Sequence, residues 1–310
     1  MSVISSPVLP IRRSDLNRFC LLAFITAIPA LTFPQADTEV FLLNLRETSE
    51  QVNPGEVINL SNNAGYDNQP SFYSNGMILF SSNRNGQTDV AVYTLSDGSL
   101  TWKTNTPGGG EYSPLRIPES EDFSAIRLDE DGHQRLYRYN WDTGKPKTLV
   151  KDLKVGYHVW YSPEILVSSV LVEDRMDLVV SNLKDGTNYT FQKNVGRSLH
   201  LIPGSGLVSF VNKEDGKRQL KSTDPVSGAT QVITDLPPGV EDVCWLSDGT
   251  ILAGVDHTIL QFKPGNSETW SIFRILPKGE ICRITRIARD PSSGLLAIVG
   301  EIPDKTKEKP

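Results

Sequence analysis

The sequence is poor in cysteine, histidine and methionine. Its 310 residues include three cysteines, four histidines and three methionines. So few cysteines exclude a disulfide-dense scaffold, and the fold must therefore rest on its apolar core. Apolar residues make up 38% of the chain, which is ordinary for a globular protein of this length. Basic stripes are also lacking, and the net charge of −6 argues against a nucleic-acid partner.

Long apolar runs are scarce as well, and the one that occurs is FCLLAFITAIPALTF at residues 19–33. It follows Arg12, Arg13 and Arg18, and a basic stretch before an apolar run of this length is the form of a secretory signal. The run is shorter than the ~20 residues of a membrane span. We expect a signal peptide over residues 1–36, with cleavage after Ala36 favoured over Ala30. A retained N-terminal anchor and a twin-arginine signal are the alternatives.

A glycine precedes an apolar stretch at six regularly spaced positions. The spacings are 45, 46, 40, 43 and 40 residues, which is the length of a four-stranded propeller blade. A second apolar strand follows each glycine, and a third follows five of them, often ending in a tight turn such as SDG or KDG. The pattern predicts an all-β, six-bladed propeller. The glycines are Gly65, Gly110, Gly156, Gly196, Gly239 and Gly279.

The sixth unit lacks its outer strands, because the apolar pattern ends near residue 302. The segment TEVFLLNL at residues 38–45 matches TDVAVYTL at residues 88–95, and EVINLSN at residues 56–62 can supply a fourth strand. We therefore expect residues 38–62 to complete the blade that begins near Gly279, which would close the ring and remove its exposed edges. A single propeller over residues 37–302 follows, with a disordered charged tail at 303–310. An evenly spaced β-sandwich is the alternative.

The stretch YDNQPSFYSNGMILFSSNRNGQTDVAVYTL at residues 66–95 resembles the WD-type repeat of TolB-like propellers. The matching features are Asp67 before Pro70, the aromatic Phe72, the Asn75-Gly76 turn and FSSNRNG; GEYSPLRI at 110–117 repeats the opening. The resemblance implies a six-bladed propeller exported to the periplasm or outside a bacterial cell. The chain leaves no room for the N-terminal α/β domain of TolB, so TolB's role in the cell envelope is not transferred.

Peptidase propellers of the prolyl oligopeptidase and dipeptidyl peptidase type carry the same repeat. Those enzymes add an α/β-hydrolase domain with a G-x-S-x-G nucleophile motif. The sequence has no such motif and no residues left to build that domain. We therefore expect no peptidase activity.

The first strand of each propeller blade lines the central channel, so residues just after each repeat glycine are expected to meet near one mouth. Four acids among them come from four different blades and could hold Ca²⁺ or another hard cation. Solvated acids, or acids bonded to backbone amides, are the favoured interpretation. The candidate binding residues are Asp67, Asn68, Glu111, Tyr112, Tyr157, His158, Arg197, Glu241, Asp242 and Glu280.

Histidine and cysteine pairs are further candidates. The resemblance extends to a lyase that holds a metal with channel histidines, and His158 and His200 lie in adjacent blades. Two imidazoles fall short of the three protein ligands that transition metals usually need, so imidazoles without a metal are favoured. Cys244 and Cys282 lie on neighbouring first strands. Two thiols that pack as small apolar groups are favoured over a disulfide there.

Several aromatic side chains fall near the first strands, where they either pack in the core or form a binding face. They are Tyr66, Tyr112, Tyr157, Trp160 and Tyr161. The first functional hypothesis is an exported, monomeric, non-enzymatic propeller that binds an envelope or extracellular protein, peptide or glycan at the channel mouth. A metal-assisted glycan lyase or hydrolase is the alternative, and a scaffold or sensor for envelope machinery is a third hypothesis. No membrane span is expected after signal cleavage, and no cofactor beyond the channel cation.

Overall fold

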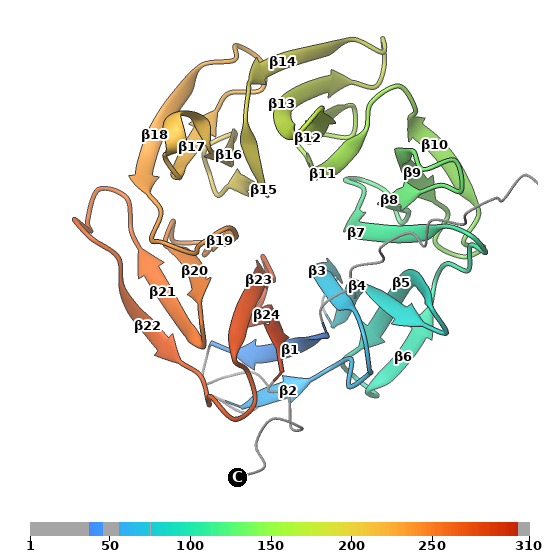
Figure 1. The fold of residues 1–310 in the computed structure, drawn as a ribbon, viewed down its shortest axis with the longest axis horizontal. Helices are drawn as coiled ribbons and strands as arrows, with labels where there is room; N and C mark the ends of the chain where they lie inside the picture. The colour runs from blue at the N-terminus through green and yellow to red at the C-terminus, as the bar shows by residue number, and fades with distance from the viewer. Residues whose placement is uncertain (1–36, 46–55, 75, 303–310) are drawn as a thin grey trace, which may run out of the picture. The chain divides into compact units, whose positions relative to one another are not determined.

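Six antiparallel sheets of four strands make up the fold of the computed structural model, which describes residues 37–45, 56–74 and 76–302. The sheets are arranged around a common centre, with one strand of each sheet innermost (Figure 1). The six-bladed all-β propeller that the sequence predicts is therefore confirmed. The innermost strands are β3 (Asp67–Ser74), β7 (Gly110–Arg116), β11 (Val155–Trp160), β15 (Val195–Ile202), β19 (Val243–Trp245) and β23 (Arg283–Arg289).

The remaining strands of each blade follow in order from the centre outward. The second strands are β4 (Met77–Arg84), β8 (Phe123–Leu128), β12 (Ile165–Val172), β16 (Leu207–Asn212), β20 (Ile251–Val255) and β24 (Leu295–Glu301). Third are β5 (Gln87–Thr94), β9 (Gln134–Tyr139), β13 (Arg175–Asn182), β17 (Gln219–Thr223), β21 (Thr258–Phe262) and β1 (Thr38–Asn44). Outermost are β6 (Ser99–Trp102), β10 (Pro146–Val150), β14 (Asn188–Gln192), β18 (Thr230–Asp235), β22 (Ser271–Ile275) and β2 (Val57–Asn59).

The sixth blade joins the two ends of the described chain. Strand β1 pairs with β24 along its whole length, from Thr38 opposite Glu301 to Asn44 opposite Leu295. Thr38 also contacts the first blade, since its N–H donates to the Gly65 carbonyl at 2.9 Å. The expected closure by N-terminal strands is confirmed, and it gives β24 a partner strand on both sides.

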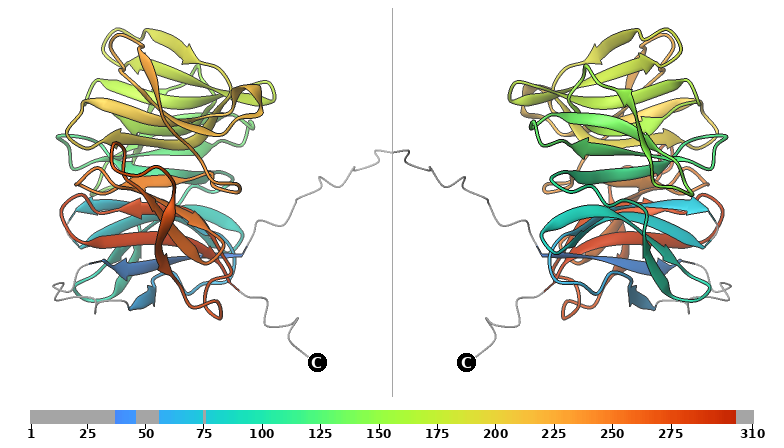
Figure 2. Two further views of the ribbon diagram at one scale, coloured as in Figure 1. Left: turned by 90° about the vertical axis from the view of Figure 1, so that its left-hand side faces the viewer. Right: turned by 90° about the vertical axis from the view of Figure 1, so that its right-hand side faces the viewer.

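The core consists of six apolar clusters, one between each pair of neighbouring blades. Alternate residues of a strand point to opposite faces, so each middle strand contributes to two clusters. Leu42 packs against the first blade and Leu43 against the fifth, and both are fully buried. The side views show the sheets packed face to face around the centre (Figure 2). This explains why the middle strands are apolar without alternation.

Some expectations lie outside the described residues: the signal peptide at 1–36, Asn75 of the expected turn, residues 46–55 of the closing segment, and the tail at 303–310. Within the part of the chain that the structure describes, no helix has the length and apolar character to cross a membrane.

Candidate functional site

Each blade contributes one side chain to the same end of the channel, and we call these six residues the mouth cluster. The rings of Tyr66 and Tyr112 meet edge to face with their centres 6.2 Å apart. The guanidinium carbon of Arg286 lies 4.9 Å from the centre of the Tyr157 ring. Four of the six residues line one cavity. The mouth cluster is Tyr66, Tyr112, Tyr157, Arg197, Asp242 and Arg286.

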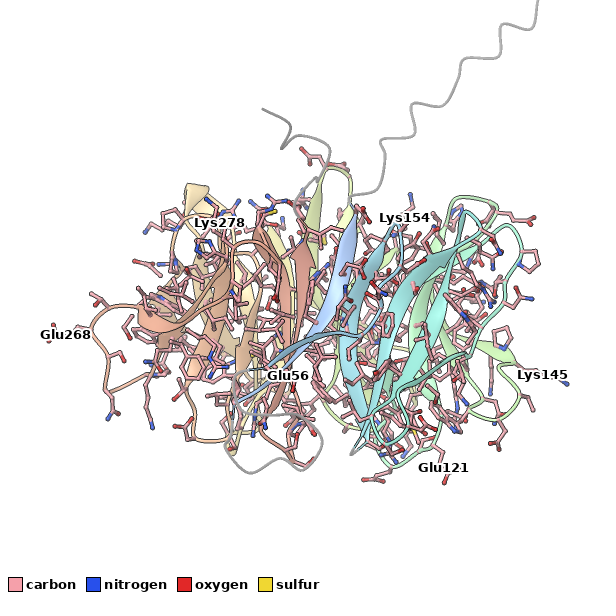
Figure 3. All side chains as sticks on the ribbon, turned by 90° about the horizontal axis from the view of Figure 1, so that it is seen from below. Glu56, Glu121, Lys145, Lys154, Glu268 and Lys278 are labelled. Carbon is pink, nitrogen blue, oxygen red and sulfur yellow. The ribbon has the colours of Figure 1, made fainter. Side chains whose placement is uncertain are left out.

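The mouth cluster lies where the innermost strands begin. Lys154 and Lys278, which precede β11 and β23, are on one face of the ring of blades, and Glu121 is on the opposite face (Figure 3). The mouth cluster therefore belongs to the face that carries Lys154 and Lys278.

A break in strand register turns these side chains into the channel. In β11 the pairing shifts between Val155 and Tyr157, and in β23 it shifts just before Arg286. Such bulges re-aim a side chain that strict alternation would place elsewhere. A Cβ added to Gly156 would lie 2.8 Å from Cδ1 of Leu171 and 3.2 Å from the Ser169 carbonyl oxygen, so the second strand approaches closely here. The glycine therefore marks the bulge that positions the next residue.

Two arginines place positive charge in the mouth. Burial lowers the pKa of Arg197, and the neighbouring Arg286 lowers it further. Nη2 of Arg197 donates to the Thr285 carbonyl at 2.6 Å. Its buried Nε has no hydrogen-bond partner among the described residues. Arg197 is thus a charged side chain with one N–H that is free to donate a hydrogen bond.

Asp242 is the acid that balances this pair. It raises the pKa of both arginines, and its Oδ2 accepts a hydrogen bond from the Ile287 N–H at 3.1 Å. Burial lowers the pKa of Arg286, but Asp242 and nearby tyrosines raise it above its ordinary value. Both guanidinium groups therefore stay charged at neutral pH.

The tyrosines form the opposite side of the mouth. Burial raises the pKa of Tyr66 well above its ordinary value, although Arg286 opposes the shift. Its phenol therefore stays protonated and can donate a hydrogen bond. Tyrosines of this kind offer a ligand both an apolar ring face and a polar tip.

Two cavities are lined by both Arg197 and Arg286. One lies deeper in the channel, has a volume of about 90 Å³ and is lined by His158, Ser198 and His200 together with mouth residues. The other lies between blades four, five and six and has a volume of about 850 Å³. Four arginines and three acids line the larger cavity: Arg197, Arg218, Arg283, Arg286, Glu241, Asp242 and Asp256.

Several residues expected at the mouth lie elsewhere. Asp67 and Glu111 are fully buried between blades, and burial raises the pKa of each to about 7. Glu111 accepts hydrogen bonds from Thr106 at 2.5 Å and from the Tyr139 hydroxyl at 3.0 Å. Glu280 is exposed in a turn before β23. The expectation that residues after every repeat glycine meet at one mouth is therefore wrong for these three acids.

Two other expected residues, Asn68 and Glu241, lie close to the mouth but make contacts outside the mouth cluster. Asn68 is buried, and its Nδ2 is 3.4 Å from Oγ1 of Thr38. Glu241 lies in the larger cavity, where it pairs with Arg218 at 3.0 Å and lies 3.8 Å from Arg197. Tyr112, Tyr157, Arg197 and Asp242 are the expected residues that the structure does bring together.

The channel histidines do not make a metal site with a third ligand. Nε2 of His158 is 2.8 Å from Oγ of Ser124, and burial lowers the pKa of His158 to about 3. Nε2 of His200 is 3.1 Å from Oγ of Ser198. Within residues 37–45, 56–74 and 76–302, no three His, Cys, Asp or Glu side chains come together as metal ligands.

The two described cysteines are unpaired, and the remaining aromatics pack between blades. Cys244 and Cys282 are free thiols. Trp160 packs between the second and third blades, and Tyr161 packs between the third and fourth. Tyr66, by contrast, reaches the mouth.

Arg286 is the residue that the sequence reasoning missed. The sixth blade was expected to start at Gly279, but β23 starts at Arg283 and Gly279 lies in an exposed turn. Ile284 and Ile287, which flank Arg286 in the sequence, are buried in the core.

No protein-family model and no curated protein sequence matches the chain. Solved structures do match. The fold is that of a TolB-like propeller. A TolB from Agrobacterium tumefaciens has a TM-score of 0.68 at 13% identity, over 87% of this chain and 99% of its own. TolB from Acinetobacter baumannii has a TM-score of 0.56 at 11% identity, over 86% of this chain and 63% of its own.

Enzymes share the same architecture. Oligogalacturonate lyase from Vibrio parahaemolyticus has a TM-score of 0.52 at 10% identity, over 88% of this chain and 100% of its own. The expected resemblance to TolB-like propellers is thus confirmed at the level of fold. Function has to be argued from the mouth cluster, because one fold hosts many activities.

Proposed function

We propose that this chain is an exported propeller that binds a protein, peptide or glycan of the bacterial envelope or extracellular space at its mouth cluster. One observation carries the proposal: six blades each place one side chain at the same mouth. The tyrosines lie on one side of this mouth, and the charged residues lie on the other. Tyrosine and arginine are the residues that most often anchor a partner.

The larger cavity supports the proposal. Its volume of about 850 Å³ falls within the ~300–1,000 Å³ typical of ligand sites. The N-terminal pattern and the TolB-like fold support export to the periplasm or beyond. Metal-assisted cleavage of a glycan, the alternative, has no specific observation in the described residues to carry it.

Capture with matched variants tests the proposal. The full chain is immobilised and exposed to an envelope extract of its own organism, in wild-type form and as Tyr112→Ala. The control is Tyr189→Ala, because Tyr189 is 58% exposed on the outermost strand β14, far from the mouth. We expect a discrete partner to be retained by the wild type and the control, and lost from Tyr112→Ala. Equal retention by all three proteins would contradict binding at the mouth. Oligogalacturonate is the first glycan to assay in parallel.

A further inference from the structure

The mouth carries more positive charge than its own acids neutralise. Arg197 and Arg286 share Asp242, and that carboxylate already accepts a backbone hydrogen bond. Glu241 lies closer to Arg218, at 3.0 Å, than to Arg197, at 3.8 Å. The chain as a whole has a net charge of −6, so two adjacent arginines in its channel run against the overall balance. Like charges held together are unfavourable until an anion joins them.

A free donor of Arg197 suits a carboxylate. The buried Nε of Arg197 has no hydrogen-bond partner among the described residues, and Nη2 of the same group is held by the Thr285 carbonyl. A guanidinium fixed in this way presents its donors in a rigid fork that matches the two oxygens of a carboxylate. Arg286, whose guanidinium lies over the Tyr157 ring, supplies the second positive charge.

The size of the deeper cavity favours the end of a chain. Its volume of about 90 Å³ leaves room for only a few water-sized groups. That space admits a terminal carboxylate with a small residue.

We propose that the mouth cluster captures the C-terminal carboxylate of a peptide between Arg197 and Arg286, with the preceding residues resting on the three tyrosines. This proposal rests on the proposed function, since it names the ligand of the same site. Captured chain ends are a recurring mode of peptide recognition. Tyrosine rings bind varied side chains at low entropic cost, so the terminal carboxylate is the group that determines which peptides bind.

A peptide pool tests the proposal. The immobilised full chain is mixed with equal amounts of a degenerate hexapeptide pool with free C-termini and of the same pool with amidated C-termini. Mass spectrometry then measures the ratio of acid to amide among the retained peptides. We expect enrichment of the acid by about tenfold or more, because charge-assisted hydrogen bonds are lost with the amide.

Variants assign the effect to the arginines. Arg286→Gln should bring the ratio close to one, and Arg197→Lys, which keeps the charge but loses the fork, should give an intermediate ratio. The control is Arg138→Gln, since Arg138 is 43% exposed and pairs with Asp122 outside both cavities; it should keep the full enrichment. Thermal unfolding confirms that each variant is folded.

The outcomes separate this proposal from the proposed function. Equal retention of acid and amide by the wild type would overturn carboxylate capture and leave partner binding at Tyr112 standing. Failure to retain any peptide, or retention of a glucuronate oligosaccharide in place of peptides, would overturn the peptide assignment. Loss of the partner in the Tyr112 experiment, without any acid preference, would show that the mouth binds by its aromatic side alone.

Discussion

At the scale of single residues, one hydroxyl connects two blades. Oγ of Ser124 in the second blade lies 2.8 Å from Nε1 of Trp160 and 2.8 Å from Nε2 of His158, both in the third blade. All three side chains are buried. The fourth and fifth blades repeat part of this contact, where Nε1 of Trp245 donates to Oγ of Ser209 at 2.9 Å.

Removal of the shared hydroxyl tests its contribution. Ser124→Ala should lower the free energy of unfolding by about 1–3 kcal/mol, because it leaves a buried indole N–H and an imidazole nitrogen without a partner. Urea unfolding measures the change. Ser168→Ala is the matched control, since Ser168 is equally buried and its Oγ has no partner among the described residues. Equal losses in the two variants would show that the shared hydroxyl contributes nothing.

Buried carboxyls make stability depend on pH. Burial, together with the smaller effects of the nearby Glu39 and Asp37, raises the pKa of Asp67 to about 7. The side chains of Ser82 and Asn63 oppose the shift. A carboxyl whose pKa is raised on folding binds more protons in the folded state, so stability falls as pH rises from about 4 to about 7. Glu111 adds to the same trend.

Asp67→Asn should remove the share of this pH dependence that belongs to Asp67. The variant should gain stability relative to the wild type as pH rises through 4 to 7, reaching on the order of 1–3 kcal/mol at pH 8, since one pKa unit is about 1.4 kcal/mol. Denaturant unfolding across this pH range measures the difference. Glu130→Gln, in the exposed turn after β8, is the control. A wild-type slope that persists in Asp67→Asn would contradict the assignment.

At the scale of elements, β1 decides whether the ring closes. It is buried at every position and forms seven residue pairs with β24. Leu42→Ala should lower the free energy of unfolding by about 2–5 kcal/mol, as expected for truncation of a fully buried leucine. Leu100→Ala, in the outer strand β6 where the side chain is 38% exposed, should cost well below 1 kcal/mol. Chemical denaturation of both variants checks this, and equal costs would show that β1 is not needed for stability.

Most strands could be predicted from turns and apolar runs, because each blade repeats the same local chemistry. The closing role of residues 38–45 followed from their likeness to residues 88–95. The start of β23 could not be predicted from Gly279, because the loop before this strand is a turn that brings Glu280 to the surface. The bulges at the mouth could not be predicted from the sequence either, since they depend on how closely the second strand of a blade approaches the innermost strand.

At the scale of the whole molecule, the sequence predicted a channel mouth, four of its six residues as binding candidates, and Tyr66 as an aromatic of either the core or a binding face. It also placed Asp67 and Glu111 there, although their side chains point between blades. A strand alternates its faces, so a shift of one residue separates a channel position from a core position. Glu111 and Tyr112 illustrate this: the acid is fully buried beside Tyr139, while the tyrosine reaches Tyr66 at the mouth.

The central claim is that the mouth cluster is where a partner binds, and site-specific photo-crosslinking in living cells tests it most directly. A photoreactive phenylalanine replaces Tyr112 in one full-length chain and Tyr189 in another. The account predicts a discrete adduct after irradiation for position 112, reduced when Arg286→Gln is added, and none for position 189. Adducts of equal yield at both positions, or at position 189 alone, would contradict it.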